Sequence, residues 1–257
     1  MDTDPLLLFM HIPKTGGTSF TQSLLSNYPR LVQYYEVGNN LTLLEYCLEK
    51  ADAFSGHFPF GYHLLTKRPC TYVTILRDPV EQIVSWFYFK YKNPSYPEAY
   101  NIGLTLETYL REPAFDSEYV NLQTRLVSGE IDVLFPNLSL AMANLDRYFS
   151  FVGITELYEE SLFLLSKRMG WKLKHYKKLN TTPNRPRKSE VSEEAIRLIR
   201  QKNELDIELY SYACRILNET ITAMSPSEEQ ELLRYKRREK KWMAFLQRKG
   251  QSKPSSE

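Results

Sequence analysis

Residues 6–20 read LLLFMHIPKTGGTSF, and this stretch decides the fold. The apolar run over 6–12 is short and uninterrupted, which is typical of a strand buried within a parallel sheet. Pro13 and the following glycine pair break the run, and the pattern then predicts a helix over 18–26. A loop between a buried strand and a helix is where α/β proteins commonly bind ligands.

The alternation of strand and helix continues along the chain. We predict strands over 53–57, 71–76 and 149–154, and helices over 104–111, 117–126, 138–148, 156–169 and 192–217. A further helix begins after the strand at 71–76, with Asp78 as N-cap, Pro79 at the first helical position and Glu81 at the third. This pattern predicts an α/β fold whose parallel sheet is covered by helices on both faces.

Length and composition limit the possible classes of protein. The chain has 257 residues, 42% of them hydrophobic, which suits one large domain with a substantial core. We expect that domain over 1–222, a charged helix over 223–249 and a disordered tail over 250–257. The formal net charge of +2 argues against nucleic acid as a partner. The basic cluster in the charged helix is either a solvated face or a site for an anionic partner.

Targeting signals are not evident in the sequence. The run over 6–10 is too short for a signal peptide, and acidic residues precede it. No stretch approaches the roughly 18 apolar residues of a transmembrane helix. Cys47, Cys70 and Cys214 lie far apart and lack metal-binding spacing, so we expect buried free thiols. These features predict a cytoplasmic protein with no transmembrane segment.

The segment 11–19 (HIPKTGGTS) combines groups that bind anions. Two glycines let the backbone turn tightly, Lys14 adds a positive charge, and the helix that follows offers unpaired N–H groups. Thr18 and Ser19 add hydroxyl donors. The loop is not a Walker A motif, because Lys14 precedes the glycines. The alternative interpretation is a plain turn between strand and helix.

A second anion-binding corner follows the strand at 71–76. Arg77 lies at its end, and Ser85 follows about two helical turns into the next helix. A guanidinium and a hydroxyl at this separation could grip one phosphate from two sides. The alternative is a structural arginine that pairs with Asp78 or Glu81.

Both corners resemble those of PAPS-dependent sulfotransferases, where PAPS is 3′-phosphoadenosine-5′-phosphosulfate. The segment 11–19 is similar to the 5′-phosphosulfate loop, and 76–87 (LRDPVEQIVSWF) is similar to the 3′-phosphate motif. Further matches resemble the branch of heparan sulfate and uronyl 2-O-sulfotransferases and their bacterial relatives: 55–63 (SGHFPFGYH), 121–125 (NLQTR), 151–156 (FVGITE) and 203–210 (NELDIELY). The resemblance spans about 6–217 and implies a P-loop-NTPase-like three-layer fold with a central parallel sheet flanked by helices.

The resemblance also implies roles for individual residues. His57 would act as general base, a task that suits a group titrating near neutrality, with His63 as the reserve candidate. Lys14 would stabilise charge on the leaving phosphate. Arg185, in the loop 180–187, would lie near phosphate, unless that loop is merely solvated and basic. The residues expected to bind PAPS, without a metal, are Lys14, Thr15, Gly16, Gly17, Thr18, Ser19, Arg77, Ser85 and Arg185.

The acceptor is less well specified. Lys90 and Lys92 occur among aromatic residues that suit sugar rings, or that form a core stripe: Trp86, Tyr88, Tyr91, Tyr96 and Tyr100. A hydroxyl of a glycan or other carbohydrate is expected, with a small-molecule alcohol as the alternative. Arg125 either contacts a ligand or forms a structural ion pair. His11, inside the first predicted strand, is expected to be structural.

Two other classes of function compete with sulfuryl transfer. A P-loop nucleotide kinase or NTPase would bind ATP with Mg²⁺. A non-catalytic protein on the same fold would bind nucleotide or glycan only. The combined presence of Lys14, His57, Arg77 and Ser85 argues against the non-catalytic alternative.

Overall fold

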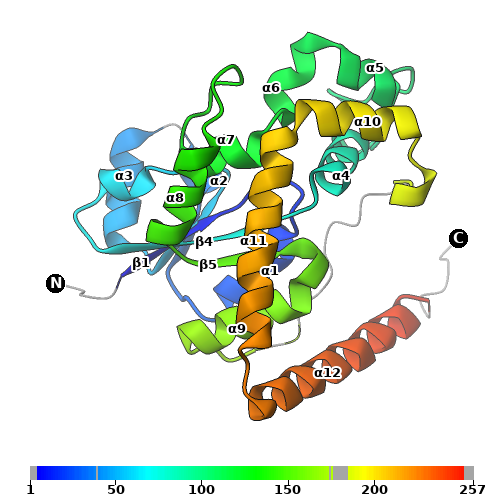
Figure 1. Ribbon diagram of the computed structural model, residues 1–257. Helices are drawn as coiled ribbons and strands as arrows, with labels where there is room; N and C mark the ends of the chain where they lie inside the picture. The colour runs from blue at the N-terminus through cyan, green and yellow to red at the C-terminus, as the bar shows by residue number, and fades with distance from the viewer. Residues whose placement is uncertain (1–4, 39, 174, 176–184, 252–257) are drawn as a thin grey trace, which may run out of the picture.

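A five-stranded parallel sheet forms the centre of the structure, a computed structural model that describes residues 5–38, 40–173, 175 and 185–251 (Figure 1). The strand order is β2-β3-β1-β4-β5. The strands are β1 Leu6–Met10, β2 Leu31–Gln33, β3 Ala53–Gly56, β4 Cys70–Leu76 and β5 Phe149–Ile154. Every residue of β1 is buried, as its continuous apolar sequence predicts. The predicted α/β fold with a parallel sheet is confirmed.

Helices cover both faces of this sheet and make three layers. In the view of Figure 1, α8 lies above the sheet and α9 below it, while α11 crosses in front of the edge at β5. The first helices are α1 Gly17–Leu25, α2 Tyr34–Val37, α3 Leu41–Lys50, α4 Pro79–Tyr91, α5 Leu106–Arg111 and α6 Asp116–Tyr119. The others are α7 Leu122–Ser128, α8 Leu138–Tyr148, α9 Tyr158–Met169, α10 Glu193–Lys202, α11 Glu204–Thr222 and α12 Pro226–Gln251.

The strand register brings the loops that follow β1, β3, β4 and β5 together at the carboxyl end of the sheet. Met10, the last residue of β1, pairs with Gly56 of β3 on one side and with Thr74 of β4 on the other. Leu76 of β4 pairs with Ile154 of β5. The strands are parallel, so their carboxyl ends meet, and the residues that follow them become neighbours.

The structure corrects several predicted boundaries. The first strand stops at Met10, so His11 lies in the loop and not in the strand. The helix predicted over 117–126 is two helices, α6 and α7, and the one over 192–217 is α10 and α11, which meet at Asn203. The sequence interpretation missed β2, α2 and α3. The C-terminal helix extends to Gln251, and 252–257 of the predicted tail lie outside the described residues.

All three cysteines are free, as predicted, but each is only half-buried. Burial raises the pKa of the Cys70 thiol to about 11. Within the described part of the chain, no helix combines the length and apolar character needed to cross a bilayer.

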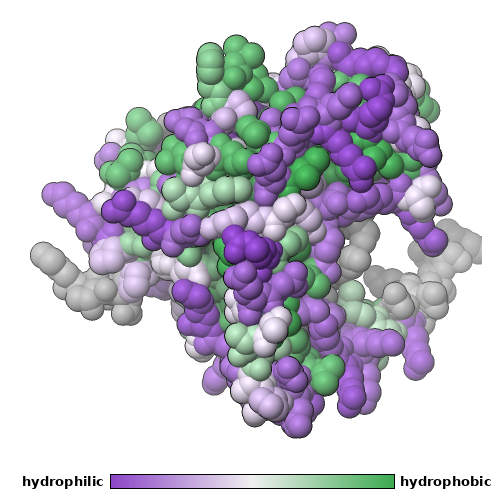
Figure 2. Space-filling model, viewed as in Figure 1, coloured by the Kyte–Doolittle hydropathy of each residue, from purple (hydrophilic) through white to green (hydrophobic). Residues whose placement is uncertain are grey.

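The charged helix α12 packs against the main domain. Leu232 and Tyr235 of α12 form a small apolar cluster with Phe163 of α9. An ion pair joins Lys236 of α12 to Glu160 of α9. Figure 2 shows that the visible face of α12 is mainly hydrophilic, as expected for a solvated face on an amphipathic helix.

Candidate active site

The loop between β1 and α1 has an unusual backbone conformation. Lys14 has φ +65° and Gly16 has φ +90°, both in the left-handed region. Gly16 is the N-cap of α1 and provides no side-chain cap, and the start of a helix such as α1 is where backbone N–H groups and the helix dipole favour an anion. Thr15 is fully buried, and its hydroxyl donates 2.9 Å to the carbonyl oxygen of Ile12. The side chain of Thr15 therefore shapes the loop and leaves only its backbone for a ligand.

Gly17 is required by close packing against a histidine. A Cβ atom at this position would lie 1.9 Å from Cδ2 of His11, far inside contact distance. The ring of His11 thus lies directly over the start of α1. Burial, followed by the neighbouring charges of His57 and Lys14, lowers the pKa of His11 to about 3. His11 is therefore neutral at pH 7.

Arg77 connects the two predicted anion-binding corners. Its Nη1 donates 2.8 Å to the carbonyl oxygen of Lys14, and its Nη2 donates 3.0 Å to Oε2 of Glu81. The pairing with Glu81 that the sequence offered as an alternative is therefore present, together with a contact to the loop. Burial, and then the nearby Arg185, lowers the pKa of Arg77 from its ordinary value.

The corner at α4 forms as the sequence predicts. Oδ1 of Asp78 accepts 3.1 Å from the N–H of Glu81, and Pro79 takes the first helical position. This cap fixes the start of α4, so Ser85 lies two turns on, buried and lining the same cavity as Arg77.

The amine of Lys14 lies near two other positive charges, those of Arg77 and Arg185. Its Nζ lies 3.8 Å from the centre of the Phe89 ring, a cation–π contact. Burial, followed by the charges of Arg77 and Arg185, lowers the pKa of Lys14 to about 8. An anion beside Lys14 would reverse that electrostatic effect and favour the protonated amine.

Arg185 approaches the cavity from a distant part of the sequence. Its Nη2 donates to Oε2 of Glu81, the oxygen that also accepts from Arg77. Nζ of Lys188 donates 2.8 Å to Oδ2 of Asp78. Residues 180–184 of the predicted loop lie outside the described residues. Arg185 and Arg187, at the end of that loop, line the cavity.

His57 follows β3 and opens onto the same cavity. Its Nδ1 lies 2.6 Å from the carbonyl oxygen of His11, and the two imidazole rings are 4.4 Å apart. A carbonyl oxygen only accepts, so Nδ1 carries the proton and Nε2 of the neutral ring is an acceptor. Burial lowers the pKa of His57, and the hydrogen bond to His11 opposes part of that shift.

These residues surround one cavity of about 960 Å³. It contains every predicted PAPS-binding residue except Thr15, and basic side chains outnumber acidic ones. The residues that line it are His11, Pro13, Lys14, Gly16, Gly17, Thr18, Ser19, His57, Arg77, Asp78, Glu81, Ser85, Trp86, Phe89, Thr155, Glu156, Tyr158, Arg185, Pro186, Arg187 and Lys188. In the described ranges, no three His, Cys, Asp or Glu side chains are grouped to hold a metal ion.

Other sequence candidates lie away from this cavity. Nδ1 of His63 lies 3.0 Å from the Tyr72 hydroxyl within an aromatic cluster. Arg125 donates to the carbonyl oxygens of Ser117, Val120 and Ile131, so it is structural and pairs with backbone instead of a carboxylate. His11, by contrast, belongs to the site.

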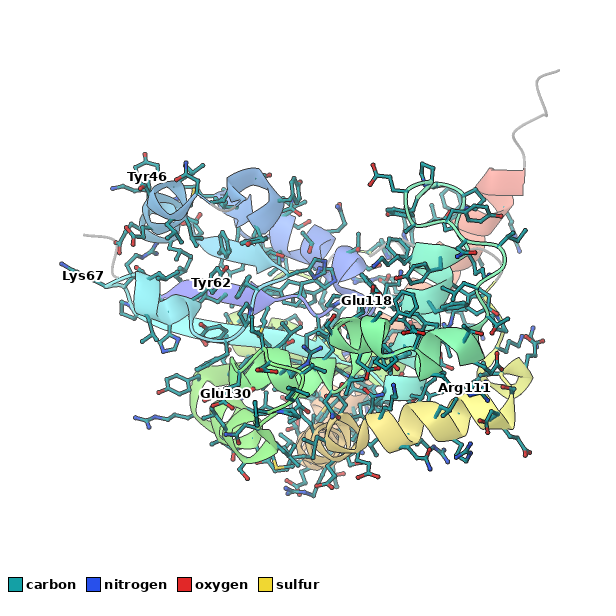
Figure 3. The ribbon with its side chains drawn as sticks, turned by 90° about the horizontal axis from the view of Figure 1, so that it is seen from above. Tyr46, Tyr62, Lys67, Arg111, Glu118 and Glu130 are labelled. Carbon is teal, nitrogen blue, oxygen red and sulfur yellow. The ribbon has the colours of Figure 1, made fainter. Side chains whose placement is uncertain are left out.

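The aromatic segment of α4 divides between core and cavity. Trp86 lines the cavity, and its Nε1 donates 2.9 Å to Oε2 of Glu118, which Figure 3 labels. Nζ of Lys90 donates 2.8 Å to the other oxygen of Glu118. Tyr91 is buried in the apolar cluster around α4 and α5. Tyr91 therefore belongs to the core stripe, whereas Trp86 lines the cavity.

Sequence reasoning did not assign roles to two polar residues that support the site. The side-chain amide of Gln123 brackets Arg77: Oε1 accepts 3.0 Å from its N–H, and Nε2 donates 2.8 Å to its carbonyl oxygen. Oγ1 of Thr155 donates to the carbonyl oxygens of Thr15 and Leu76. A hydroxyl residue directly after β5, at the ligand-binding edge, was an available signal for Thr155.

Several known proteins are similar to this chain in sequence. A family model described as galactose-3-O-sulfotransferase matches residues 49–253. Mouse heparan-sulfate 6-O-sulfotransferase 2 is 26% identical over 97% of this chain and 50% of its own length. Mouse galactose-3-O-sulfotransferase 3 is 29% identical over 55% of this chain and 36% of its own. The chain spans about half the length of the first of these relatives. The structure of mouse sulfotransferase SULT7A1 complexed with PAP aligns with 91% of this chain and 84% of that one, with a TM-score of 0.41 and 13% identity.

Proposed function

This chain belongs to the galactose-3-O-sulfotransferase family, and from that premise we propose that it transfers a sulfuryl group from PAPS to a hydroxyl of a carbohydrate. Membership confirms the resemblance to sulfotransferases. The relatives described above are named 6-O- and 3-O-sulfotransferases, whereas the sequence motifs pointed to the 2-O branch. One observation carries the proposal: Arg77 bonds to the carbonyl oxygen of Lys14, so two anion-binding corners share one cavity with His57.

The cavity fits a donor with phosphates at two positions. Arg77 and Ser85 would hold the 3′-phosphate, with Arg185 beside them. Nε of Arg77 and Nε of Arg185 are buried and have no hydrogen-bond partner among the described atoms, and phosphate oxygens would supply acceptors. At the other corner, the start of α1 and Lys14 would hold the 5′-phosphosulfate.

His57 would act as the general base. Nδ1 is committed to the His11 carbonyl, so Nε2 is the nitrogen that would take the proton of the acceptor hydroxyl. The lowered pKa keeps the ring neutral, and therefore able to accept a proton, at pH 7. The acceptor oxygen then bonds to sulfur as the bond from sulfur to the 5′-phosphate oxygen breaks.

Lys14 would stabilise that leaving oxygen. Most Lys14 amines are protonated at pH 7, because the pKa of about 8 lies above that value. The N–H groups at the start of α1 would share the negative charge. The Lys14 amine already contacts Phe89 and the N–H groups belong to α1, so little reorganisation is needed during transfer.

The acceptor would enter beside His57 and Trp86. A carbohydrate hydroxyl is the proposed acceptor, because the relatives are named for heparan sulfate and galactose and because aromatic Trp86 and Phe89 line the cavity. A small-molecule alcohol remains the alternative acceptor.

The decisive experiment measures transfer of labelled sulfate from PAPS. Acceptors would be desulfated heparan sulfate, galactose-terminated oligosaccharides and simple alcohols, each with and without EDTA. We expect transfer to at least one carbohydrate and binding of adenosine 3′,5′-bisphosphate that does not depend on Mg²⁺. Mg²⁺-dependent ATP binding without bisphosphate binding would favour the nucleotide kinase or NTPase instead. Bisphosphate binding with no transfer to any acceptor would favour a binding protein.

A further inference from the structure

A single carboxylate oxygen in the cavity holds two arginines. Oε2 of Glu81 accepts 3.0 Å from Nη2 of Arg77 and also accepts from Nη2 of Arg185. The exposed fraction of the side chain is 21% for Glu81, 14% for Arg77 and 20% for Arg185, so water screens the contact only in part. Charge interactions in such a setting are stronger than on an open surface.

The other carboxylates of the cavity have different tasks. Asp78 caps α4 and accepts from Lys188. Glu156 accepts from the N–H of Asp78 and from the hydroxyl of Tyr210. Glu81 is thus the acidic residue whose side-chain oxygen accepts from both of the guanidiniums that are proposed to bind phosphate.

Each of the two arginines also has a hydrogen-bond donor, Nε, that Glu81 does not satisfy. Nε of Arg77 and Nε of Arg185 are buried without a hydrogen bond among the described atoms, and Nε of Arg77 lies 3.8 Å from Oε1 of Glu156. An unsatisfied buried donor is costly, and a phosphate offers more acceptor oxygens and more negative charge than one carboxylate. A phosphate would therefore compete effectively with Glu81 for this pair.

We propose that Glu81 is a counter-anion that competes with the 3′-phosphate of the nucleotide for Arg77 and Arg185. This inference rests on the proposed function, because it takes the Arg77 corner as the 3′-phosphate site. Without phosphate, Glu81 holds both guanidiniums in the cavity. With phosphate bound, the charge of Glu81 opposes the ligand, lowers its affinity and speeds release of adenosine 3′,5′-bisphosphate. Glu81 is a positioning residue that tunes nucleotide exchange.

The test compares nucleotide binding by the full chain and by Glu81→Gln, using calorimetry and stopped-flow dissociation at low ionic strength. Glutamine keeps the side-chain shape and removes the charge. We expect about tenfold tighter binding of adenosine 3′,5′-bisphosphate, with slower dissociation. Adenosine 5′-monophosphate lacks the 3′-phosphate and should bind both proteins equally. Glu81→Asp keeps the charge and should not bind the bisphosphate more tightly.

Glu194→Gln is the matched control, because Glu194 of α10 also bridges two arginines, Arg111 and Arg197. Figure 3 shows Arg111 beside α10, and neither it nor Glu194 lines the cavity. This variant should leave both affinities unchanged. The inference is overturned if folded Glu81→Gln binds the bisphosphate no more tightly, or gains equally for the monophosphate. If the unaltered protein does not bind the bisphosphate, the proposed function itself fails.

Discussion

Nδ1 of His57 lies 2.6 Å from the backbone carbonyl oxygen of His11, which joins the end of β3 to the loop after β1. This contact fixes which ring nitrogen of His57 carries the proton. Because the acceptor is a backbone oxygen, the position of Nδ1 depends on the loop after β1. The same residue, His11, places its ring over Gly17 at the start of α1. His11 therefore contacts both the proposed general base and the start of the helix that is proposed to bind the phosphosulfate.

Removing the imidazole of His57 should abolish most turnover while leaving nucleotide binding intact. General-base catalysis contributes about 10² to 10⁴ in rate, so His57→Ala should lose a factor in that range in kcat. Binding of adenosine 3′,5′-bisphosphate should change little, since its phosphates would contact the other corner residues. His63→Gln is the control, because His63 lies in an aromatic cluster outside the cavity. Unchanged turnover in His57→Ala would remove His57 from this role.

The pH dependence of kcat/KM should be bell-shaped. On the acid side, activity should fall as His57 gains a proton, at a pH below its ordinary 6.5, because burial lowers its pKa. On the alkaline side, activity should fall near pH 8 as Lys14 loses its charge. Lys14→Arg keeps a charge at high pH and should move only the alkaline limb upward, whatever its overall activity. An alkaline limb that stays near pH 8 in Lys14→Arg would show that another group causes it.

A methyl group at position 17 should disturb the loop between β1 and α1, the proposed phosphosulfate site. The Cβ of Gly17→Ala would overlap the ring of His11, and overpacking of this kind typically costs about 1–3 kcal/mol. We expect a lower free energy of unfolding and weaker binding of adenosine 3′,5′-bisphosphate. Gly103→Ala is the control, since the nearest atom to its added Cβ would be 3.6 Å away. Equal stability and affinity in Gly17→Ala and the unaltered chain would contradict the packing seen here.

Local signals were sufficient for the strands that carry the site. Apolar runs predicted β1, β3, β4 and β5, and the sequence from Asp78 predicted the cap of α4 with its hydrogen bond to Glu81. The short edge strand β2 has only three residues, none fully buried, and so has no strong apolar pattern.

Long-range contacts explain what the sequence could not show. Oδ1 of Asn203 accepts 2.8 Å from the N–H of Asn121, and Oδ1 of Asn121 accepts 3.2 Å from the N–H of Asp206. Each asparagine lies at a helix break that was missed, and each break is stabilised by a residue more than 80 positions away. The contact between Arg185 and Glu81 is likewise set by the tertiary fold, so the sequence could indicate the arginine but not its partner.

Gln123 should be essential for the position of Arg77. Its amide satisfies both the N–H and the carbonyl oxygen of Arg77, and its side chain is buried. Gln123→Ala leaves these groups without their partner, at a cost of about 1–3 kcal/mol for each group that stays buried. We expect a lower free energy of unfolding in denaturant and roughly tenfold weaker binding of adenosine 3′,5′-bisphosphate. Gln201→Ala, on the exposed face of α10, should change neither quantity. A Gln123→Ala protein that loses stability but binds the bisphosphate normally would show that Gln123 supports the fold without positioning Arg77.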